Sequence, residues 1–261
     1  MTGVPTGARG CMAWGDFGGG RLGGGAYSDG MGWLEEALQS ALSGSRVDLT
    51  PKSVVEREDA LPGRAEEMPV AERNVVTGNP MTGPFPEGHE QIVLGFGCFW
   101  GAEKRMWQLD GVWTTAVGYA GGWTENPTYE EACTGQTGHT EAVLVDFDPK
   151  TISAGEVLAA FFESHDPTTL NRQGNDVGTQ YRSVILATTP EQLELAERMA
   201  ARYGEVLADK GFDAVTTEVG LLSEVRSGRF FYAEDYHQQY LHKVPNGYDC
   251  HARTGVACPI G

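Results

Sequence analysis

The sequence predicts an α+β protein: a two-layer sandwich with a ferredoxin-like β-α-β-β-α-β core, a mixed sheet and an irregular C-terminal tail. Three observations lead to this prediction. From residue 90 onward, short apolar runs typical of strands alternate with segments whose apolar residues have helical spacing. Two of the helical segments begin with clear capping signals. Residues 244–261 are rich in Gly and Pro and show no periodicity.

The predicted elements follow one another in a simple order. Residues 91–96 form an apolar run that predicts a buried strand, and residues 98–108 predict a helix. Residues 111–119 and 139–147 predict the second and third strands. Ser153 and Glu156 form a capping box, which predicts a helix over residues 153–164. A fourth strand is expected over residues 181–187, and Thr189-Pro190 opens a long helix that ends near residue 209.

Two segments precede this domain, which we expect to extend from residue 90 to 261 and to include the tail 244–261. Residues 1–45 form a Gly-rich extension that we expect to be disordered, because Gly-rich chain cannot offset its ordering entropy by burial. Within it, residues 33–43 have apolar positions that fit a short isolated helix. Residues 46–89 are polar and Pro-rich, and we interpret them as an arm that packs on the domain or as a linker.

Composition limits the class of protein. The chain has 261 residues, 40% of them hydrophobic, which is enough for a real core. A net charge of -17 argues against nucleic-acid and anionic-membrane partners, which both reward clustered Lys and Arg. We find no apolar run of membrane-spanning length and no secretory signal, so we expect a soluble, cytoplasmic protein. Five cysteines, at positions 11, 98, 133, 250 and 258, do not suggest a disulfide scaffold.

The stretch GFGCFWG, residues 95–101, places Cys98 where a predicted strand turns into a helix. A helix start stabilises anions, so we expect the Cys98 thiolate to be stabilised and the thiol pKa to be lowered; a fall of about two units from about 8.5 would make thiolate the main form at pH 7. Phe99 and Trp100 suggest an apolar socket for a small, neutral electrophile. The alternatives are a buried structural cysteine, a loose dinucleotide loop, which the bulky aromatic residues disfavour, and a metal ligand, for which no paired ligand exists.

Two further stretches hold candidate polar residues. Glu141 lies near the start of an apolar strand, where partial desolvation raises the pKa of a carboxyl as a general acid requires; the alternative is a solvated edge residue. Tyr129 is a candidate hydrogen-bond donor, with a structural tyrosine as the alternative. In the loop of residues 171–183, Asp176 and Tyr181 are candidate site residues, although Asp176 would equally suit a turn cap.

The tail contains Cys250 and Cys258. Two thiols in a flexible tail suit a relay that approaches a distant sulfur, exchanges with it and moves away. The alternative is a zinc site with His251, but two cysteines and one histidine leave a ligand missing.

Taken together, these segments resemble the peptide methionine sulfoxide reductases of the A type. The matching motifs span nearly all of residues 90–261: GCFWG, GYAGGWTENPTY, TGHTEAV, HDPTT, RQGNDVGTQYRS, FYAEDYHQQYL and the Cys-containing tail. Two parts of the arm, ALPGRAEEMPV and GNPMTGPFPEG, resemble an extension found in some members. The resemblance implies a catalytic domain that repairs oxidised proteins and free methionine sulfoxide, with no cofactor and no metal.

The resemblance also implies a role for each candidate. Cys98 is then the nucleophile that attacks the sulfur of methionine S-sulfoxide and becomes a sulfenic acid. Glu141 is the general acid that protonates the sulfoxide oxygen. The implied substrate-binding residues are Phe99 and Trp100, which hold the S-methyl group, Tyr129 and Tyr181, which donate hydrogen bonds to the oxygen, and Asp176, which arranges water and polar groups.

Recycling is where this sequence departs from the best-known family pattern. In many members the recycling cysteine directly follows Gly-Tyr and precedes a glycine-rich stretch, whereas here Asp249 stands between Tyr248 and Cys250, and His-Ala-Arg follows. The resemblance implies that Cys250 resolves the sulfenic acid as a disulfide with Cys98, that Cys258 is a second recycling thiol, and that thioredoxin is the reductant. We expect a monomer.

Two other functions remain open at this point. The chain could be a non-catalytic module whose aromatic pocket binds a methylthioether, but that function gives the tail thiols no role. It could also be a thiol peroxidase, in which Cys98 reacts with peroxide, but that function gives the aromatic socket no role.

Overall fold

The computed structural model describes residues 53–250 and 252–260. The predictions of disorder for residues 1–45 and of a short helix at 33–43 lie outside the described residues, as do residues 46–52 of the arm.

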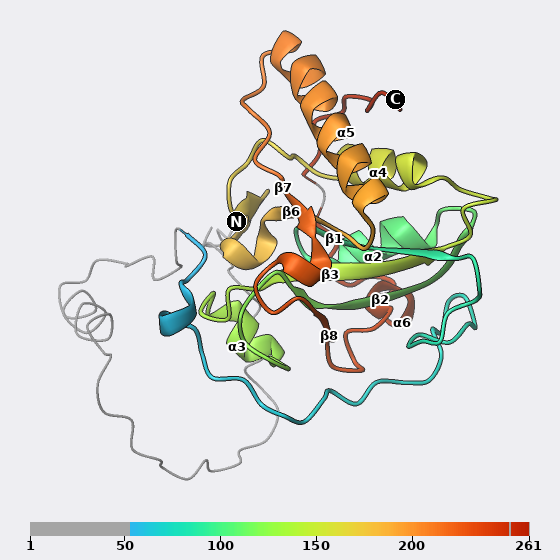
Figure 1. Cartoon of the computed structure of the whole chain (residues 1–261), viewed down its shortest axis with the longest axis vertical. Coiled ribbons are helices and arrows are strands. Elements are labelled where there is room, and N and C mark those ends of the chain that lie inside the picture. The colour runs from blue at the N-terminus through green and yellow to red at the C-terminus, as the bar shows by residue number, and fades with distance from the viewer. Residues whose placement is uncertain (1–52, 251, 261) are drawn as a thin grey trace, which may run out of the picture.

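Six strands form one sheet in the order β7-β6-β1-β3-β2-β8 (Figure 1). All neighbouring strands are antiparallel except β6 and β7, so the sheet is mixed, as predicted. The four strands of the predicted β-α-β-β-α-β segment are adjacent in the order β6-β1-β3-β2, and β7 and β8 extend the sheet at its two edges. The strand bounds are β1 Glu90–Phe96, β2 Val112–Ala120, β3 Thr140–Phe147, β6 Ser183–Ala187, β7 Glu218–Leu221 and β8 Phe230–Tyr232.

Three helices cover one face of the sheet (Figure 1): α2 Phe99–Trp107, α4 Ala154–Glu163 and α5 Pro190–Asp209. The capping box of α4 is present, because Ser153 Oγ accepts the Glu156 N–H and the Glu156 carboxylate accepts the Ser153 N–H. Thr189 caps α5, with Pro190 in the first turn. Both predicted helix starts are therefore confirmed, and the α+β class with them.

The other face of the sheet is covered by part of the Pro-rich arm. Met81 is fully buried against strand residues of this face, and Val70 and Phe85 pack beside it. Asn74, also fully buried, donates a hydrogen bond from Nδ2 to the Thr115 carbonyl of β2 at 3.0 Å. Because both faces are covered, all 8 residues of β3 are buried.

Several short elements were not predicted from the sequence. They are α3 Tyr129–Cys133, β4 Arg172–Gln173, β5 Asp176–Val177, α6 Tyr240–Lys243 and the 3-10 turns Arg57–Asp59, Thr179–Tyr181 and Leu222–Glu224, besides the edge strands β7 and β8. Elements of this length show no usable periodicity and depend on tertiary contacts. The prediction that a strand begins at Tyr181 is wrong by two residues, since Tyr181 ends a 3-10 turn and β6 begins at Ser183.

The C-terminal tail is irregular, as predicted, but it is not free. Residues 252–260 form no helix or strand. Tyr203 of α5 donates from its hydroxyl to the Val256 carbonyl at 2.8 Å, and the Cys258 N–H donates to Glu163 Oε1 of α4 at 2.8 Å. Cys258 is only 6% exposed. The expectation of a flexible tail is therefore wrong for this segment, because its backbone and its thiol are held against two helices.

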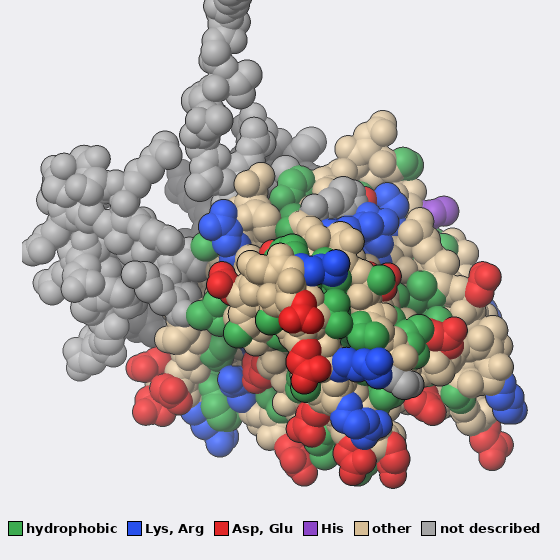
Figure 2. Space-filling model, turned by 90° about the horizontal axis from the view of Figure 1, so that it is seen from above, with side chains coloured by type: hydrophobic (Ala, Val, Ile, Leu, Met, Phe, Trp, Pro, Cys, Tyr) green, Lys and Arg blue, Asp and Glu red, His purple; other side chains and the backbone are tan. Residues whose placement is uncertain are grey.

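The surface carries charges of both signs. Figure 2 shows Lys and Arg side chains beside Asp and Glu side chains over the face seen from above. On that face the mixture gives no extended positive field of the kind that attracts a polyanion. Among residues 53–250 and 252–260, no helix is both long and apolar enough to cross a bilayer.

Candidate active site

Cys98 lies at the point where β1 ends and α2 begins. It is the N-cap residue of α2 and is 9% exposed. The turn before it requires glycine, because Gly97 has φ +98° and a Cβ there would lie 2.9 Å from the side chain of Gln173. The predicted strand-to-helix turn at this cysteine is thus confirmed.

Glu141 of β3 faces the same helix start. Its Oε2 accepts a hydrogen bond from the Phe99 N–H at 2.9 Å, and the residue is 2% exposed. Burial raises the pKa of this carboxyl to about 8; the Phe99 N–H works against the shift and the charge of Asp176 adds to it. At neutral pH Glu141 therefore carries a proton that it can donate.

The thiol of Cys98 differs from the sequence-based expectation. The backbone N–H of Trp100 does lower its pKa, as a helix start should. Burial and the charge of Glu141 have larger, opposite effects, and the pKa of Cys98 lies well above its ordinary value. The prediction that the helix start lowers the pKa of this thiol is therefore wrong, because burial and Glu141 outweigh the backbone N–H.

Three more of the candidate residues meet around this pair. Tyr129 begins α3, Asp176 begins β5, and Tyr181 ends the turn before β6. Burial raises the pKa of both tyrosines, and the charges of Glu141 and Cys98 raise them further, so both phenols keep their protons and lie within electrostatic reach of the two groups. Burial also raises the pKa of Asp176, against a hydrogen bond from the Tyr248 hydroxyl to Oδ1 at 3.0 Å.

Phe99 and Trp100 belong to an aromatic cluster. The ring of Phe99 stacks on Tyr129 with centroids 6.4 Å apart, and the ring of Trp100 stacks on Tyr240 at 4.1 Å. Trp100 Nε1 donates to His237 Nδ1 at 3.0 Å. Both rings are thus fixed in place beside Cys98, where they form an apolar wall.

Residues 234–240 hold this wall from the other side; sequence reasoning matched them to a family motif but assigned them no role. Glu234 accepts hydrogen bonds from the Tyr119 hydroxyl at 3.0 Å and from the Tyr129 N–H at 2.8 Å. Burial lowers the pKa of His237 to about 3, so the ring is neutral, and since Nδ1 accepts from Trp100, its proton is on Nε2. The signals in the sequence were the family motif FYAEDYHQQYL and the density of polar and aromatic residues in it.

A second missed residue is the fully buried Glu103 of α2. Its carboxylate accepts hydrogen bonds from the Gln239 N–H at 2.8 Å, from Gln239 Nε2 at 2.7 Å and from the Thr115 hydroxyl at 3.0 Å. Gln239 itself is left-handed, with φ +47°. Glu103 therefore links α2, the helix that begins at Cys98, to the segment of residues 234–240.

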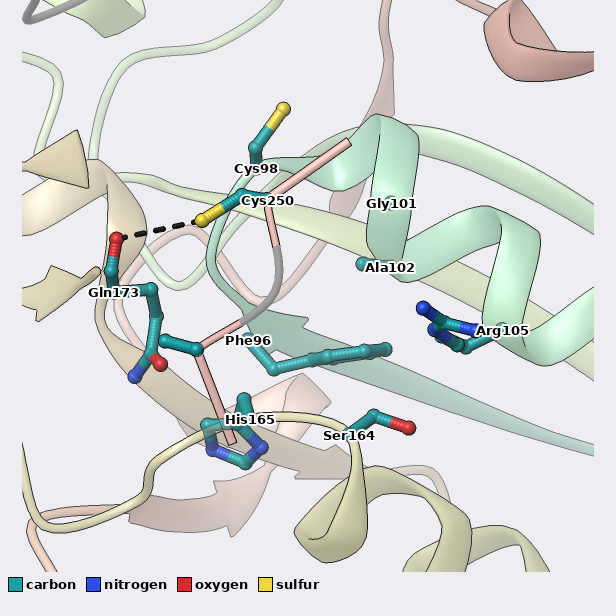
Figure 3. A pocket seen from close by; sticks show the side chains of 10 residues that line it. Phe96, Cys98, Gly101, Ala102, Arg105, Ser164, His165, Gln173 and Cys250 are labelled. Atoms are coloured by element: carbon teal, nitrogen blue, oxygen red, sulfur yellow. Dashed lines mark hydrogen bonds between the residues drawn. The ribbon is translucent and has the colours of Figure 1, made fainter. Parts of the chain in front are cut away.

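The tail thiols occupy different environments. Cys250 and Cys98 line one narrow cavity of about 10 Å³, the room of a single water molecule (Figure 3). Both are free thiols, and the sulfur of Cys250 points to the Gln173 carbonyl at 3.5 Å rather than to Cys98 (Figure 3). Cys258 lies instead between α4 and α5, where burial and Glu163 raise its pKa to about 12. The fold thus brings one of the two predicted tail thiols to Cys98.

Within the described ranges 53–250 and 252–260, no three His, Cys, Asp or Glu side chains are grouped so as to hold a metal ion. The groups that do converge are two thiols, a protonated carboxyl and two phenols. A fold and a site of this kind define a class, the α+β oxidoreductases that use cysteine thiols.

Comparisons with known proteins identify the family within this class. The family model described as peptide methionine sulfoxide reductase matches residues 90–258. MsrA of Rhodospirillum centenum is 58% identical over 202 residues, which cover 77% of this chain and 90% of the relative. MsrA of Corynebacterium kroppenstedtii is 54% identical over 210 residues, 80% of this chain and 96% of that protein.

Solved structures agree. The methionine sulfoxide reductase A of Corynebacterium diphtheriae superposes with a TM-score of 0.72 at 46% identity, covering 80% of this chain and 99% of that one. Reduced Mxr1 of Saccharomyces cerevisiae superposes with a TM-score of 0.56 at 34% identity, covering 65% of this chain and 94% of that one. The chain belongs to the peptide methionine sulfoxide reductase family.

Proposed function

We propose that this protein reduces the S epimer of methionine sulfoxide, free and within proteins, to methionine, and so repairs oxidised proteins. The observation that carries the proposal is the placement of the Cys98 thiol and the protonated Glu141 carboxyl at one helix start. Family membership, with relatives named MsrA at 58% and 54% identity, supports it.

The first half of the reaction uses the proton on Glu141. A sulfoxide oxygen is a poor leaving group until it is protonated, and Tyr129 and Tyr181 are phenol donors that can hold it while Glu141 gives it a proton. Cys98 Sγ attacks the sulfur, the oxygen passes to Cys98 as a sulfenic acid, and methionine leaves. The thiol proton replaces the one that Glu141 donates, so the step consumes no further proton.

The apolar wall gives a reason for the stereochemistry. If the S-methyl group packs against Phe99 and Trp100, the oxygen must face Glu141 and the phenols, and Cys98 approaches from the remaining side. Only one epimer satisfies all three positions. Asp176 stays close enough to Glu141 to raise its pKa, and we assign it the ordering of water beside the oxygen.

The experiment measures methionine formed from each epimer with dithiothreitol as the reductant. We expect turnover of the S epimer, little of the R epimer, and none in Cys98→Ser. Full activity of Cys98→Ser, or preference for the R epimer, would show that the assignment is wrong. Consumption of hydrogen peroxide faster than of the S epimer would favour a thiol peroxidase instead.

We propose that Cys250 resolves the sulfenic acid as a disulfide with Cys98, which thioredoxin then reduces. The shared cavity of the two thiols supports this pairing. Cys250→Ser should form about one methionine per enzyme and then stop when thioredoxin is the only reductant. Normal thioredoxin-supported turnover in that variant would remove Cys250 from the pathway.

Cys258 as a second recycling thiol requires a larger movement. Its N–H is bound to Glu163 and its side chain is buried, so residues 252–260 must leave α4 and α5 before the sulfur can exchange. If Cys258 takes part, Cys258→Ser slows thioredoxin-dependent turnover but not the first methionine formed. We further propose that the protein is cytoplasmic and monomeric. Size-exclusion chromatography of the full chain tests the oligomeric state.

A further inference from the structure

In the proposed resolving step, the Cys250 thiol must lose its proton when its sulfur attacks the Cys98 sulfenic acid. A thiol attacks a sulfenic acid as the thiolate. Burial, followed by the charge of Asp176, raises the pKa of Cys250 to about 11. At pH 7 only about one molecule in 10⁴ would then carry a Cys250 thiolate, so the step needs a group that takes the proton as the sulfur moves to Cys98.

The carboxyl of Asp176 is placed to be that group. Burial raises its pKa, and the neighbouring Tyr248 and Cys250 side chains act against that shift. The Tyr248 hydroxyl donates to Oδ1 at 3.0 Å, while the Cys250 thiol donates to the Gln173 carbonyl at 3.5 Å. The other oxygen, Oδ2, is buried and has no hydrogen-bond partner of regular geometry among the described residues. One carboxylate oxygen is therefore occupied by the tyrosine and the other is open to a proton.

The segment that carries Cys250 is held on both sides of the thiol. On one side Tyr248 binds Asp176. On the other, Asp249, the residue that separates the tyrosine from the cysteine in this sequence, forms an ion pair with Lys104 of α2 at 3.0 Å. Gly101 of α2 leaves the room for it, since a Cβ there would lie 2.8 Å from Asp249 Oδ1. The Cys250 thiol is therefore held at the wall of the cavity that Cys98 also lines.

We propose that Asp176 is the proton acceptor for the resolving thiol Cys250, a catalytic role that it takes after methionine has left; this inference rests on the proposed function. Oδ2 of Asp176 takes the thiol proton, and the sulfur electron pair of Cys250 attacks Sγ of the Cys98 sulfenic acid. The S–O bond breaks, and the leaving hydroxide takes the proton that Asp176 has accepted, which gives water and restores the carboxylate. Cys98 is reduced, Cys250 is oxidised, and the products are one disulfide and one water.

The experiment isolates the resolving step in the full chain without added reductant. One equivalent of the S epimer is mixed with enzyme, and quenched samples are assayed for methionine, for the dimedone-trapped sulfenic acid and for the Cys98–Cys250 disulfide by mass. The two steps then give separate rate constants. Where a variant reduces the substrate slowly, hydrogen peroxide forms the same sulfenic acid on Cys98 and leaves only the second step to be measured.

Asp176→Asn is the test variant and Asp249→Asn is its matched control. Both remove one negative charge next to Cys250, but only the first removes the proton acceptor. We expect disulfide formation to slow by about 10²-fold or more in Asp176→Asn, with sulfenic acid accumulating, and by less than about threefold in Asp249→Asn. In Asp176→Asn the rate should also rise about tenfold per pH unit between pH 7 and 9, as thiolate becomes available below the pKa of Cys250.

A second variant tests the same carboxyl from its other side. Tyr248→Phe removes a hydrogen bond that lowers the Asp176 pKa, so the low-pH fall in the rate of disulfide formation should move to higher pH. A structural role for Tyr248 alone would not move it. The titratable groups around Asp176 that act on this profile are Cys98, Tyr129, Glu141, Tyr181, Tyr248 and Cys250.

Three outcomes would count against the proposal in distinguishable ways. Equal slowing by Asp176→Asn and Asp249→Asn, or a wild-type rate in Asp176→Asn, would overturn the role of Asp176 alone. If Cys98 in Cys250→Ser formed a disulfide with another cysteine at the wild-type rate, Cys250 would not be the resolving thiol, and the proposed role of Asp176 would fail with it. Failure of the wild-type protein to form methionine would overturn the proposed function itself.

Discussion

Glu141 should make the protein less stable at the pH at which it works. Its carboxyl is buried, and its pKa rises from an ordinary value of 4.5 to about 8. A pKa raised in the folded state means that folding favours the protonated form, so stability is fully present below pH 4.5 and is lost as the pH rises towards 8. Between pH 4.5 and pH 7 the loss is about 3 kcal/mol, at about 1.36 kcal/mol for each pH unit.

The variant Glu141→Gln keeps an oxygen to accept the Phe99 N–H but cannot ionise. The free energy of unfolding of Glu141→Gln relative to wild type should therefore increase by about 3 kcal/mol from pH 4.5 to pH 7 and level off above about pH 8. The change with pH is the quantity of interest, because any constant cost of fitting the amide cancels from it. The same substitution should lower the rate of methionine formation about 10²- to 10⁴-fold.

Urea unfolding of the full chain, repeated at half-unit steps from pH 4.5 to 9, measures the effect. Glu197→Gln on the exposed face of α5 is the control, since it removes a carboxylate from the surface and should change stability by less than about 0.5 kcal/mol at every pH. A difference between Glu141→Gln and wild type that stays constant across this range would refute the reasoning, because it would mean that the carboxyl titrates alike in the folded and unfolded chains.

Three further predictions follow from the site. The rate of methionine formation should fall above about pH 8 as Glu141 loses its proton; a rate that still climbs through pH 9 would mean that thiolate formation limits the step instead. Trp100→Phe keeps an apolar ring but loses the bond to His237, and kcat/KM for a methionine sulfoxide peptide should fall about 2- to 10-fold; no change would assign that bond no part in the wall. Lys104→Met removes the partner of Asp249 and should slow disulfide formation about two- to threefold, measured by thiol loss after one turnover; an unchanged rate would show that the ion pair does not hold the segment.

Much of the framework could be predicted because its signals are local. The capping box at Ser153 and the Thr189-Pro190 start of the long helix depend on residues within one turn of each other, and the structure has both. The strand-to-helix turn at Cys98 could be predicted for the same reason. The edge strands β7 and β8 could not be predicted, because they pair with strands distant in the sequence. The start of α3 does carry a local signal, the capping box of Thr128 and Glu131, which the sequence analysis did not use.

The sequence named the candidate residues that the fold brings together and the direction of the Glu141 pKa shift, but it did not predict the pKa of Cys98 or the roles of Glu103 and residues 234–240. The candidate residues are carried by motifs in the sequence, and the fold gathers them from β3, α2, α3 and β5. The pKa of Cys98 could not be read from the motif, because a helix start lowers it while burial and Glu141 raise it by more. The outcome depends on how deeply two groups 43 positions apart in the chain are buried together, which no local pattern records.

The sequence by itself determined the order of the elements, the capped helix starts and the glycine turn that presents Cys98, because these depend on backbone conformation and on nearest neighbours. Only the tertiary structure decided that Glu141 is protonated, that residues 234–240 hold the aromatic wall, and that Cys250 rather than Cys258 shares the cavity of Cys98. Each of those outcomes depends on burial and on contacts between segments far apart in the chain, and burial is a property of the assembled fold.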